Sequence, residues 1–172
     1  MTFAIRGERP GDEQAIRRVV EQAFGQSAEA NLIDALRRSD ALSLSLVAEL
    51  NGEIAGHVAF SAIEVVAPHA TQAALGLAPL AVLPAFQNRG IGTALVHRSL
   101  EDCQAQGHKI VIVLGDPLYY LRFGFERAAD YGIECPYDVP PEAFMVVELV
   151  AGALAGCHGI VRYRPEFDAV TT

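Results

Sequence analysis

A glycine-containing segment, Gln87-Asn88-Arg89-Gly90-Ile91-Gly92-Thr93, joins an apolar run to a stretch with helical spacing. The first turn of a helix carries N–H groups without helical partners and a positive dipole end, and both attract phosphate. Gly90 and Gly92 lack the Cβ atoms that would hold a phosphate away, and Arg89 supplies a planar positive charge. The segment therefore predicts a cradle for an anion of pyrophosphate size, or else a helix start eased by glycine with no ligand.

The spacing of this segment excludes two common phosphate loops, because it has neither G-x-G-x-x-G nor Gly-Lys followed by Ser or Thr. Gln87-x-x-Gly90-x-Gly92 resembles instead the acetyl-CoA signature Q/R-x-x-G-x-G/A of the GNAT acetyltransferases. The run Tyr119-Tyr120-Leu121-Arg122-Phe123-Gly124-Phe125 is similar to the late Tyr-x-x-x-Gly-Phe element of that family. Together with Gly115-Asp116-Pro117, it resembles the YhbS-like branch of N-acetyltransferases.

The resemblance implies a cofactor and a set of residues that bind it. Acetyl-CoA would be the cosubstrate, and no metal is expected. Leu80, Ala81 and Val82 would pair with the pantetheine arm and the acetyl carbonyl. Arg89, Gly90, Gly92 and Thr93 would hold the pyrophosphate, and Gln87, Asn88 and Ile91 complete the predicted cofactor-binding set.

The resemblance also points to an acid for the thiolate that leaves during acetyl transfer. Tyr120 lies four residues before Gly124, where GNAT enzymes commonly place a general-acid tyrosine, and such proton transfer is worth about 10²–10⁴-fold in rate. The alternative is that Tyr120 only packs within a short helix. Tyr119 is expected to be a core residue or a substrate wall, and the Val82 N–H is a candidate donor to the developing oxyanion.

A general base for the amine is not readable from the sequence. Many relatives carry a glutamate on the strand that we expect over Ala74–Leu83, but this stretch contains no acid. The remaining candidates are Glu49, His57, Glu64, Asp116 and water. Asp116 and His57 also have structural interpretations. Asp116 before Pro117 has the residue types of a helix N-cap, and a lone histidine on a strand, such as His57, is usually structural.

The elements that would position these residues follow from hydrophobic periodicity and turn signals. Asn51-Gly52 is a strong signal for a tight hairpin turn. Strands are predicted over Thr2–Arg6, Leu42–Leu50, Glu53–Glu64, Ala74–Leu83, Ile110–Leu114, Phe144–Val150 and Gly159–Tyr163. Helices are predicted over Asp12–Phe24, Ala28–Arg38, Ile91–Gln106 and Asp116–Arg122.

The strand before the glycine segment has one irregular position. Pro79 cannot donate to a β-ladder, so this strand is expected to bulge. The strand, helix and strand from Ala74 to Leu114 have the spacing of a crossover between parallel strands. The predicted fold is therefore mixed α/β, a mostly antiparallel seven-stranded sheet flanked by helices. The resemblance implies that it is of GNAT (acyl-CoA N-acyltransferase) type, with a β-bulge and splayed central parallel strands.

Composition limits the class of protein and the kinds of partner. With 172 residues, 51% of them hydrophobic, the chain is expected to be one domain spanning 1–172. The net charge is −8 and Lys109 is the single lysine, so neither nucleic acid nor membrane is an expected partner. The first residues lack the apolar core of a signal peptide, and three scattered cysteines suggest reduced thiols, so a cytoplasmic location is expected.

The resemblance implies that the protein is an acetyl-CoA-dependent N-acetyltransferase. Acetyl would pass directly to a primary amine of a small molecule or peptide, through a ternary complex. Two alternatives stay open: a non-catalytic module that senses acyl-CoA, and an acyltransferase for a hydroxyl acceptor. The identity of the acceptor and the choice between monomer and homodimer also stay open.

Overall fold

The computed structural model describes residues 2–170. The helices are α1 (Glu13–Phe24), α2 (Ala28–Arg38), α3 (Ile91–Ala105) and α4 (Pro117–Tyr120), and a 3-10 turn, η5, covers Pro165–Ala169. The strands are β1 (Ala4–Gly7), β2 (Leu42–Leu50), β3 (Glu53–Ala67), β4 (Ala70–Val82), β5 (Ile110–Leu114), β6 (Glu126–Arg127), β7 (Ile133–Glu134), β8 (Phe144–Glu148) and β9 (Gly159–Arg162). Every predicted helix and strand is therefore present within a few residues of its expected bounds.

The strands join into one sheet in the order β1-β2-β3-β4-β5-β8-β6, with β9 pairing β3 and β7. Along the main path only β4 and β5 run parallel, which confirms the crossover. The described sheet has nine strands where seven were expected. The two additional strands, β6 and β7, have two residues each, too few to show any periodicity in the sequence.

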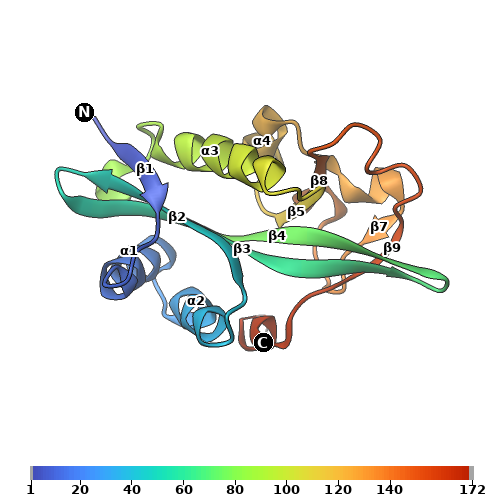
Figure 1. Cartoon of the computed structure of the whole chain (residues 1–172), viewed down its shortest axis with the longest axis horizontal. Helices are drawn as coiled ribbons and strands as arrows, with labels where there is room; N and C mark the ends of the chain where they lie inside the picture. Colours follow the sequence, from blue (N-terminus) through green and yellow to red (C-terminus); the bar gives the residue numbers. More distant parts are fainter. Residues whose placement is uncertain (1, 171–172) are drawn as a thin grey trace.

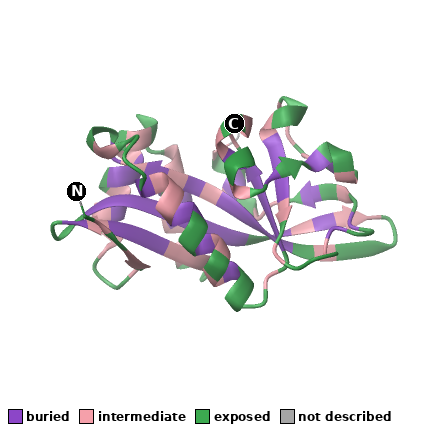
Figure 2. Ribbon diagram, turned by 90° about the horizontal axis from the view of Figure 1, so that it is seen from above, coloured by how far each residue is buried: buried purple, intermediate pink, exposed green. Residues whose placement is uncertain are grey.

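Helices cover both faces of the sheet (Figure 1). Helices α1 and α2 lie on one face, and α3 and α4 on the other. Helix α1 buries Ile16, Val19 and Val20, which the periodicity places on one side of the helix. Helix α3 comes close to β3, because a Cβ on Gly56 would lie 2.9 Å from a methyl of Ile91. Buried residues accordingly run along the middle of the sheet (Figure 2).

The expected bulge and splay are both present in β4. Between the pairs Val58–Leu80 and Phe60–Leu77, β4 advances three residues while β3 advances two, so an extra residue sits at Ala78–Pro79. The β4–β5 ladder pairs Leu75–Leu77 with 111–113 and goes no further, although β4 continues to Val82. One edge of β4 is therefore left open at the amino end of α3.

The hairpin of β3 and β4 is longer than expected. β3 continues to Ala67 and β4 begins at Ala70, and the hairpin extends beyond the rest of the sheet (Figure 1). On the β4 side of this stretch, residues 70–73 are exposed or half-buried without a regular alternation, so no periodicity marks it as a strand. Among residues 2–170, no helix combines the length and apolar character that crossing a bilayer requires.

Candidate functional site: a cofactor cradle that meets a second cavity

The glycine segment folds as a strained loop that opens α3. Asn88 and Gly90 have φ values of 62° and 90°, and Gly90 precedes the first helical residue. Within the described chain no side chain caps this helix end. The N–H groups of the first turn therefore remain available to an anion.

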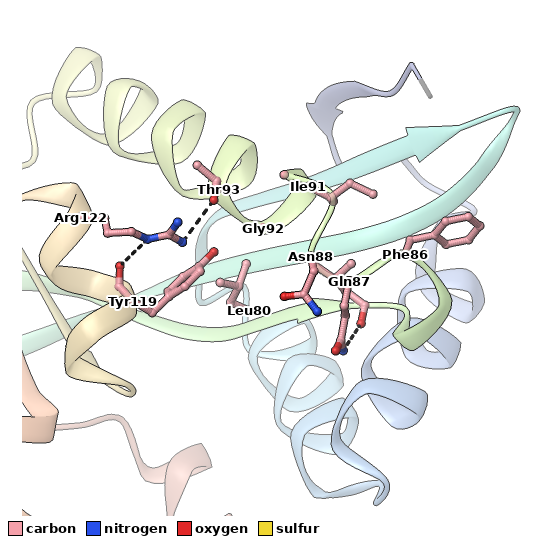
Figure 3. Close-up of a pocket in the computed structure, with 11 residues that line it drawn as sticks. Leu80, Phe86, Gln87, Asn88, Ile91, Gly92, Thr93, Tyr119 and Arg122 are labelled. Atoms are coloured by element: carbon pink, nitrogen blue, oxygen red, sulfur yellow. Dashed lines mark hydrogen bonds between the residues drawn. The ribbon is translucent and has the colours of Figure 1, made fainter.

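A cavity of about 520 Å³ opens at this helix end (Figure 3). Its lining contains all of the predicted cofactor-binding residues except Ala81 and Arg89. The lining residues are Leu80, Val82, Phe86, Gln87, Asn88, Gly90, Ile91, Gly92, Thr93, Tyr119 and Arg122. The strand end and the helix start therefore come together as the signature implied.

The open edge of β4 presents backbone groups to this cavity. Leu83 N–H donates to the Ala55 carbonyl on β3 at 2.8 Å. Because N–H directions alternate along an antiparallel strand, the N–H groups of Leu80 and Val82 point away from β3, toward the gap beside β5. The Val82 carbonyl, on the same edge, accepts a bond from Gln87 Nε2 at 3.0 Å. Gln87 thus ties the loop to the strand, and the backbone at 80 and 82 has the direction that an added strand needs.

Ala81 and Arg89 are placed differently from the other predicted residues. Ala81 lies opposite His57 in the β3–β4 ladder and shares its face, so the side chain of Ala81 is buried toward α1 and α2. Arg89 is exposed, with its guanidinium 5.9 Å from the centroid of the Phe86 ring. Neither side chain lines the cavity.

Three residues of the cavity wall had no predicted cofactor role: Phe86, Tyr119 and Arg122. The Arg122 guanidinium stacks over the Tyr119 ring at 4.5 Å and donates to Thr93 Oγ1 at 3.4 Å (Figure 3). A Cβ on Gly92 would lie 2.7 Å from the Tyr119 hydroxyl, so the absence of a side chain at Gly92 leaves room for this close approach. Among the lining residues given above, Arg122 is the one with a positively charged side chain. The signal in the sequence was the arginine inside the Tyr-x-x-x-Gly-Phe run.

Tyr120 occupies a different environment from its neighbour. Its side chain is only 7% exposed and lines a second cavity. A Cβ on Gly115 would lie 2.6 Å from the Tyr120 ring, so Gly115 makes room for that ring. Burial raises the pKa of the Tyr120 phenol, which keeps the hydroxyl protonated at neutral pH.

The second cavity measures about 500 Å³ and meets the first at Leu80 and Tyr119, which line both. It reaches from the open end of β5 to α2 and the C-terminal turn η5. Phe24, the last residue of α1, and Tyr137, in the loop that follows β7, belong to its lining. Tyr119 is part of this wall as well as of the wall of the first cavity.

Of the candidate bases, only Asp116 lines either of these two cavities. Glu49 is held by Arg6 at 2.6 Å and Glu64 pairs with Arg162. Asp116 lines the second cavity, but its carboxylate caps α4 by accepting from the Leu118 N–H at 3.0 Å, as its residue type indicated. Glu29, at the start of α2, also lines this cavity and was not predicted.

His57 is fully buried away from both cavities. Its Nε2 lies 2.8 Å from the Ser45 hydroxyl, which donates to Glu8 at 2.7 Å. Arg37 in turn binds both oxygens of Glu8, at 2.9 and 3.0 Å. Burial lowers the pKa of His57 to about 4. His57 therefore belongs to a structural network that joins α2 to the sheet.

Comparison with known proteins identifies this arrangement. The model of the acetyltransferase (GNAT) domain matches residues 4–128. The N-acetyltransferase YhbS of Escherichia coli K12 is 37% identical over 165 residues, covering 95% of this chain and 98% of YhbS. A second E. coli N-acetyltransferase, YjhQ, is 37% identical over 144 residues, covering 82% of this chain and 78% of YjhQ.

Solved structures agree with these relatives. The crystal structure of E. coli YhbS in complex with CoA superposes with a TM-score of 0.91 at 36% identity, covering 96% of this chain and 92% of that one. A GNAT acetyltransferase from Brucella melitensis in complex with acetyl-CoA gives a TM-score of 0.80 at 36% identity, covering 97% and 99%. With its signature loop, splayed strands and near full-length relatives, the chain belongs to the GNAT family of N-acetyltransferases.

Proposed function

We propose that this protein transfers the acetyl group of acetyl-CoA directly to a primary amine, with both substrates bound at once. The observation that carries the proposal is the meeting of two cavities at Leu80 and Tyr119, in the gap between β4 and β5. One cavity has the helix end, the glycines and Arg122 that suit a diphosphate; the other is large enough for an acceptor. The CoA and acetyl-CoA complexes of the two relatives support this assignment.

The cofactor fits the residues that are present. The free first turn of α3 and the Arg122 guanidinium would hold the pyrophosphate, and the open edge at Leu80 and Val82 would pair with the pantetheine arm. Acetyl-CoA supplies an activated thioester. The remaining steps use groups of this chain.

The reaction balances without a covalent enzyme intermediate. The neutral amine nitrogen attacks the thioester carbonyl carbon, a C–N bond forms and the C–S bond breaks. The Val82 N–H would donate to the carbonyl oxygen while it carries negative charge. Tyr120 would give its proton to the departing thiolate, and the proton lost by the amine would leave through water or a carboxylate of the second cavity.

Thermal unfolding with acetyl-CoA, CoA and NADH tests the cofactor half of this proposal. Acetyl-CoA at 100 times its Kd should stabilise the native state by about 2.7 kcal/mol, whereas NADH should not. Release of free thiol with a panel of amines then separates an enzyme from a protein that only binds acyl-CoA. If millimolar acetyl-CoA does not raise the midpoint of thermal unfolding, the proposal is refuted.

A matched pair of variants locates the binding site. Gly90 and Gly152 have φ values of 90° and 86°, and a Cβ on either would meet nothing within 4 Å. Gly90→Asp and Gly152→Asp therefore carry similar backbone strain and the same added charge. Stabilisation by acetyl-CoA should disappear only in Gly90→Asp, because the new carboxylate would repel the pyrophosphate.

A further inference from the structure

The second cavity has a chemistry that narrows the class of acceptor, and this inference rests on the function proposed above. Its wall is mainly apolar and aromatic. Tyr163 stacks on Tyr137 with ring centroids 5.5 Å apart, and its centroid lies 5.0 Å from that of the Phe167 ring. Leu77 and Pro79 of the bulged strand contribute aliphatic surface. Such a lining favours an apolar body, because each buried apolar Å² contributes about 25 cal/mol.

Two further lining residues leave apolar surface open to solvent. Phe24 is 41% exposed and Leu114 is 42% exposed, although both are large hydrophobic residues. They come from distant parts of the chain, the end of α1 and the end of β5. An apolar acceptor would cover surface that the fold leaves exposed at this cavity.

The charges of the cavity favour a cation and disfavour an anion. Among the described lining residues, Glu29 and Asp116 are acidic and none is basic. The Glu29 carboxylate is half-buried and accepts from Gln26 Nε2 at 3.0 Å. The Asp116 carboxylate is engaged by the backbone of α4. An acceptor that carried its own carboxylate would find no basic partner among these residues, and its desolvated charge would be costly.

We propose that the acceptor is a primary amine on an aromatic or branched apolar body, with no carboxylate beside the amine. Glu29 attracts the ammonium form, and the aromatic wall binds the body. The amine then loses a proton and attacks the thioester as described above. Both a free small amine and the first residue of a peptide have this chemistry, since the backbone amide of a peptide replaces the carboxylate.

The acceptor panel for thiol release compares matched compounds. The ring amines are phenethylamine and tryptamine, and their carboxylated counterparts are phenylalanine and tryptophan. Spermidine is a polycation without a ring, and an amidated peptide beginning with phenylalanine represents the peptide source. The ring amines should exceed the amino acids and spermidine in kcat/KM by at least about tenfold. Equal or better use of phenylalanine or spermidine would overturn the inference.

Two variants test the residues named. Glu29→Gln should raise the KM for phenethylamine about fivefold and leave stabilisation by acetyl-CoA unchanged. Glu101→Gln, an exposed position on α3 that does not line the cavity, makes the same charge change and should alter neither. Phe24→Ala should raise the KM for phenethylamine but not the KM for spermidine. An unchanged KM in both Glu29→Gln and Phe24→Ala contradicts the placement of the acceptor.

Calorimetry separates this inference from the proposed function. Titration of phenethylamine into the protein with CoA measures acceptor binding without turnover. If acetyl-CoA stabilises the protein but no ring amine binds or reacts, the acceptor inference fails and the cofactor assignment stands. If acetyl-CoA does not stabilise it, the proposed function itself fails.

Discussion

Neighbouring tyrosines of α4 have different surroundings. Tyr119 reaches the start of α3, where the Arg122 guanidinium stacks on its ring. Tyr120 is buried beside Gly115 and lines only the second cavity. Successive helical residues point about 100° apart, so adjacent side chains can serve different cavities. The proposed reaction assigns proton delivery to Tyr120, which faces the acceptor side alone, and a wall position to Tyr119, which lines both cavities.

Replacing each tyrosine by phenylalanine should give different kinetic results. Tyr120→Phe should lower kcat by about 10²-fold or more with little change in the KM for acetyl-CoA, because it removes the proton donor and keeps the ring. Tyr119→Phe should keep most of kcat. Steady-state thiol release measures both. Equal losses of kcat in the two variants would contradict the assignment of the acid.

The pH dependence of kcat offers a second check on Tyr120. Burial raises the pKa of its phenol above the usual value of 10. The acid therefore stays protonated throughout the range in which an amine becomes neutral. We expect kcat to rise with pH and to show no decline at any pH value below 10. A decline between pH 8 and 9 that Tyr120→Phe abolished would show that the phenol ionises too early.

At the scale of elements, the site depends on where pairing stops. The β4–β5 ladder ends at Leu77 while β4 runs on to Val82. The short helix α4 follows β5 directly and supplies the wall on the other side of the gap. Its start is fixed by Asp116 and Pro117, which have the residue types of an N-cap and a first helical position.

The cap of α4 can be tested separately from catalysis. Asp116→Ala should lower the free energy of unfolding by about 1 kcal/mol, since the Leu118 N–H loses its acceptor. Asp116→Asn should restore most of that loss, because an asparagine oxygen also accepts. Urea denaturation measures both. If Asp116→Asn were stable but inactive, Asp116 would be a base in addition to a cap.

For the molecule as a whole, a part-buried polar network joins β2 and β3 to α2 through His57, Ser45 and Arg37, with Glu8, the residue after β1, at its centre. Burial alone would raise the pKa of Glu8, but hydrogen bonds from Arg37 and Ser45 outweigh it and hold the pKa below its usual value. Burial holds His57 neutral, with a pKa of about 4 against the usual 6.5. The folded state thus favours a charged Glu8 and a neutral His57.

Acid should therefore destabilise the fold in a defined range. The unfolded chain binds a proton at His57 before the folded chain does, so this contribution is complete above pH 6.5 and is lost as the pH falls to about 4. The loss amounts to about 3 kcal/mol. Urea denaturation between pH 7 and 4.5 measures it. His57→Gln should flatten the slope, whereas His69→Gln, in the exposed hairpin turn, should not; equal slopes in all three proteins would contradict this role.

Local sequence signals were enough to predict a hairpin turn, a bulge and the loop that opens α3. Residue types placed the Asn51-Gly52 turn, whose φ values are both positive, and the bulge at Pro79. The spacing of Gln87, Gly90 and Gly92 predicted the loop that opens α3 and lines the first cavity. These features depend on neighbours within a few residues, which is why the sequence alone sufficed.

Only the tertiary structure decided how distant residues meet. It assigned His57 and Glu49 to ion and hydrogen-bond networks, and it brought Glu29 of α2 into one cavity with Tyr120 and Tyr163. It also turned the Ala81 side chain away from the cavity, because β-strand side chains alternate between faces and the register is fixed by pairing across the whole sheet. Such placement depends on long-range packing and strand register, which no local pattern in the sequence records.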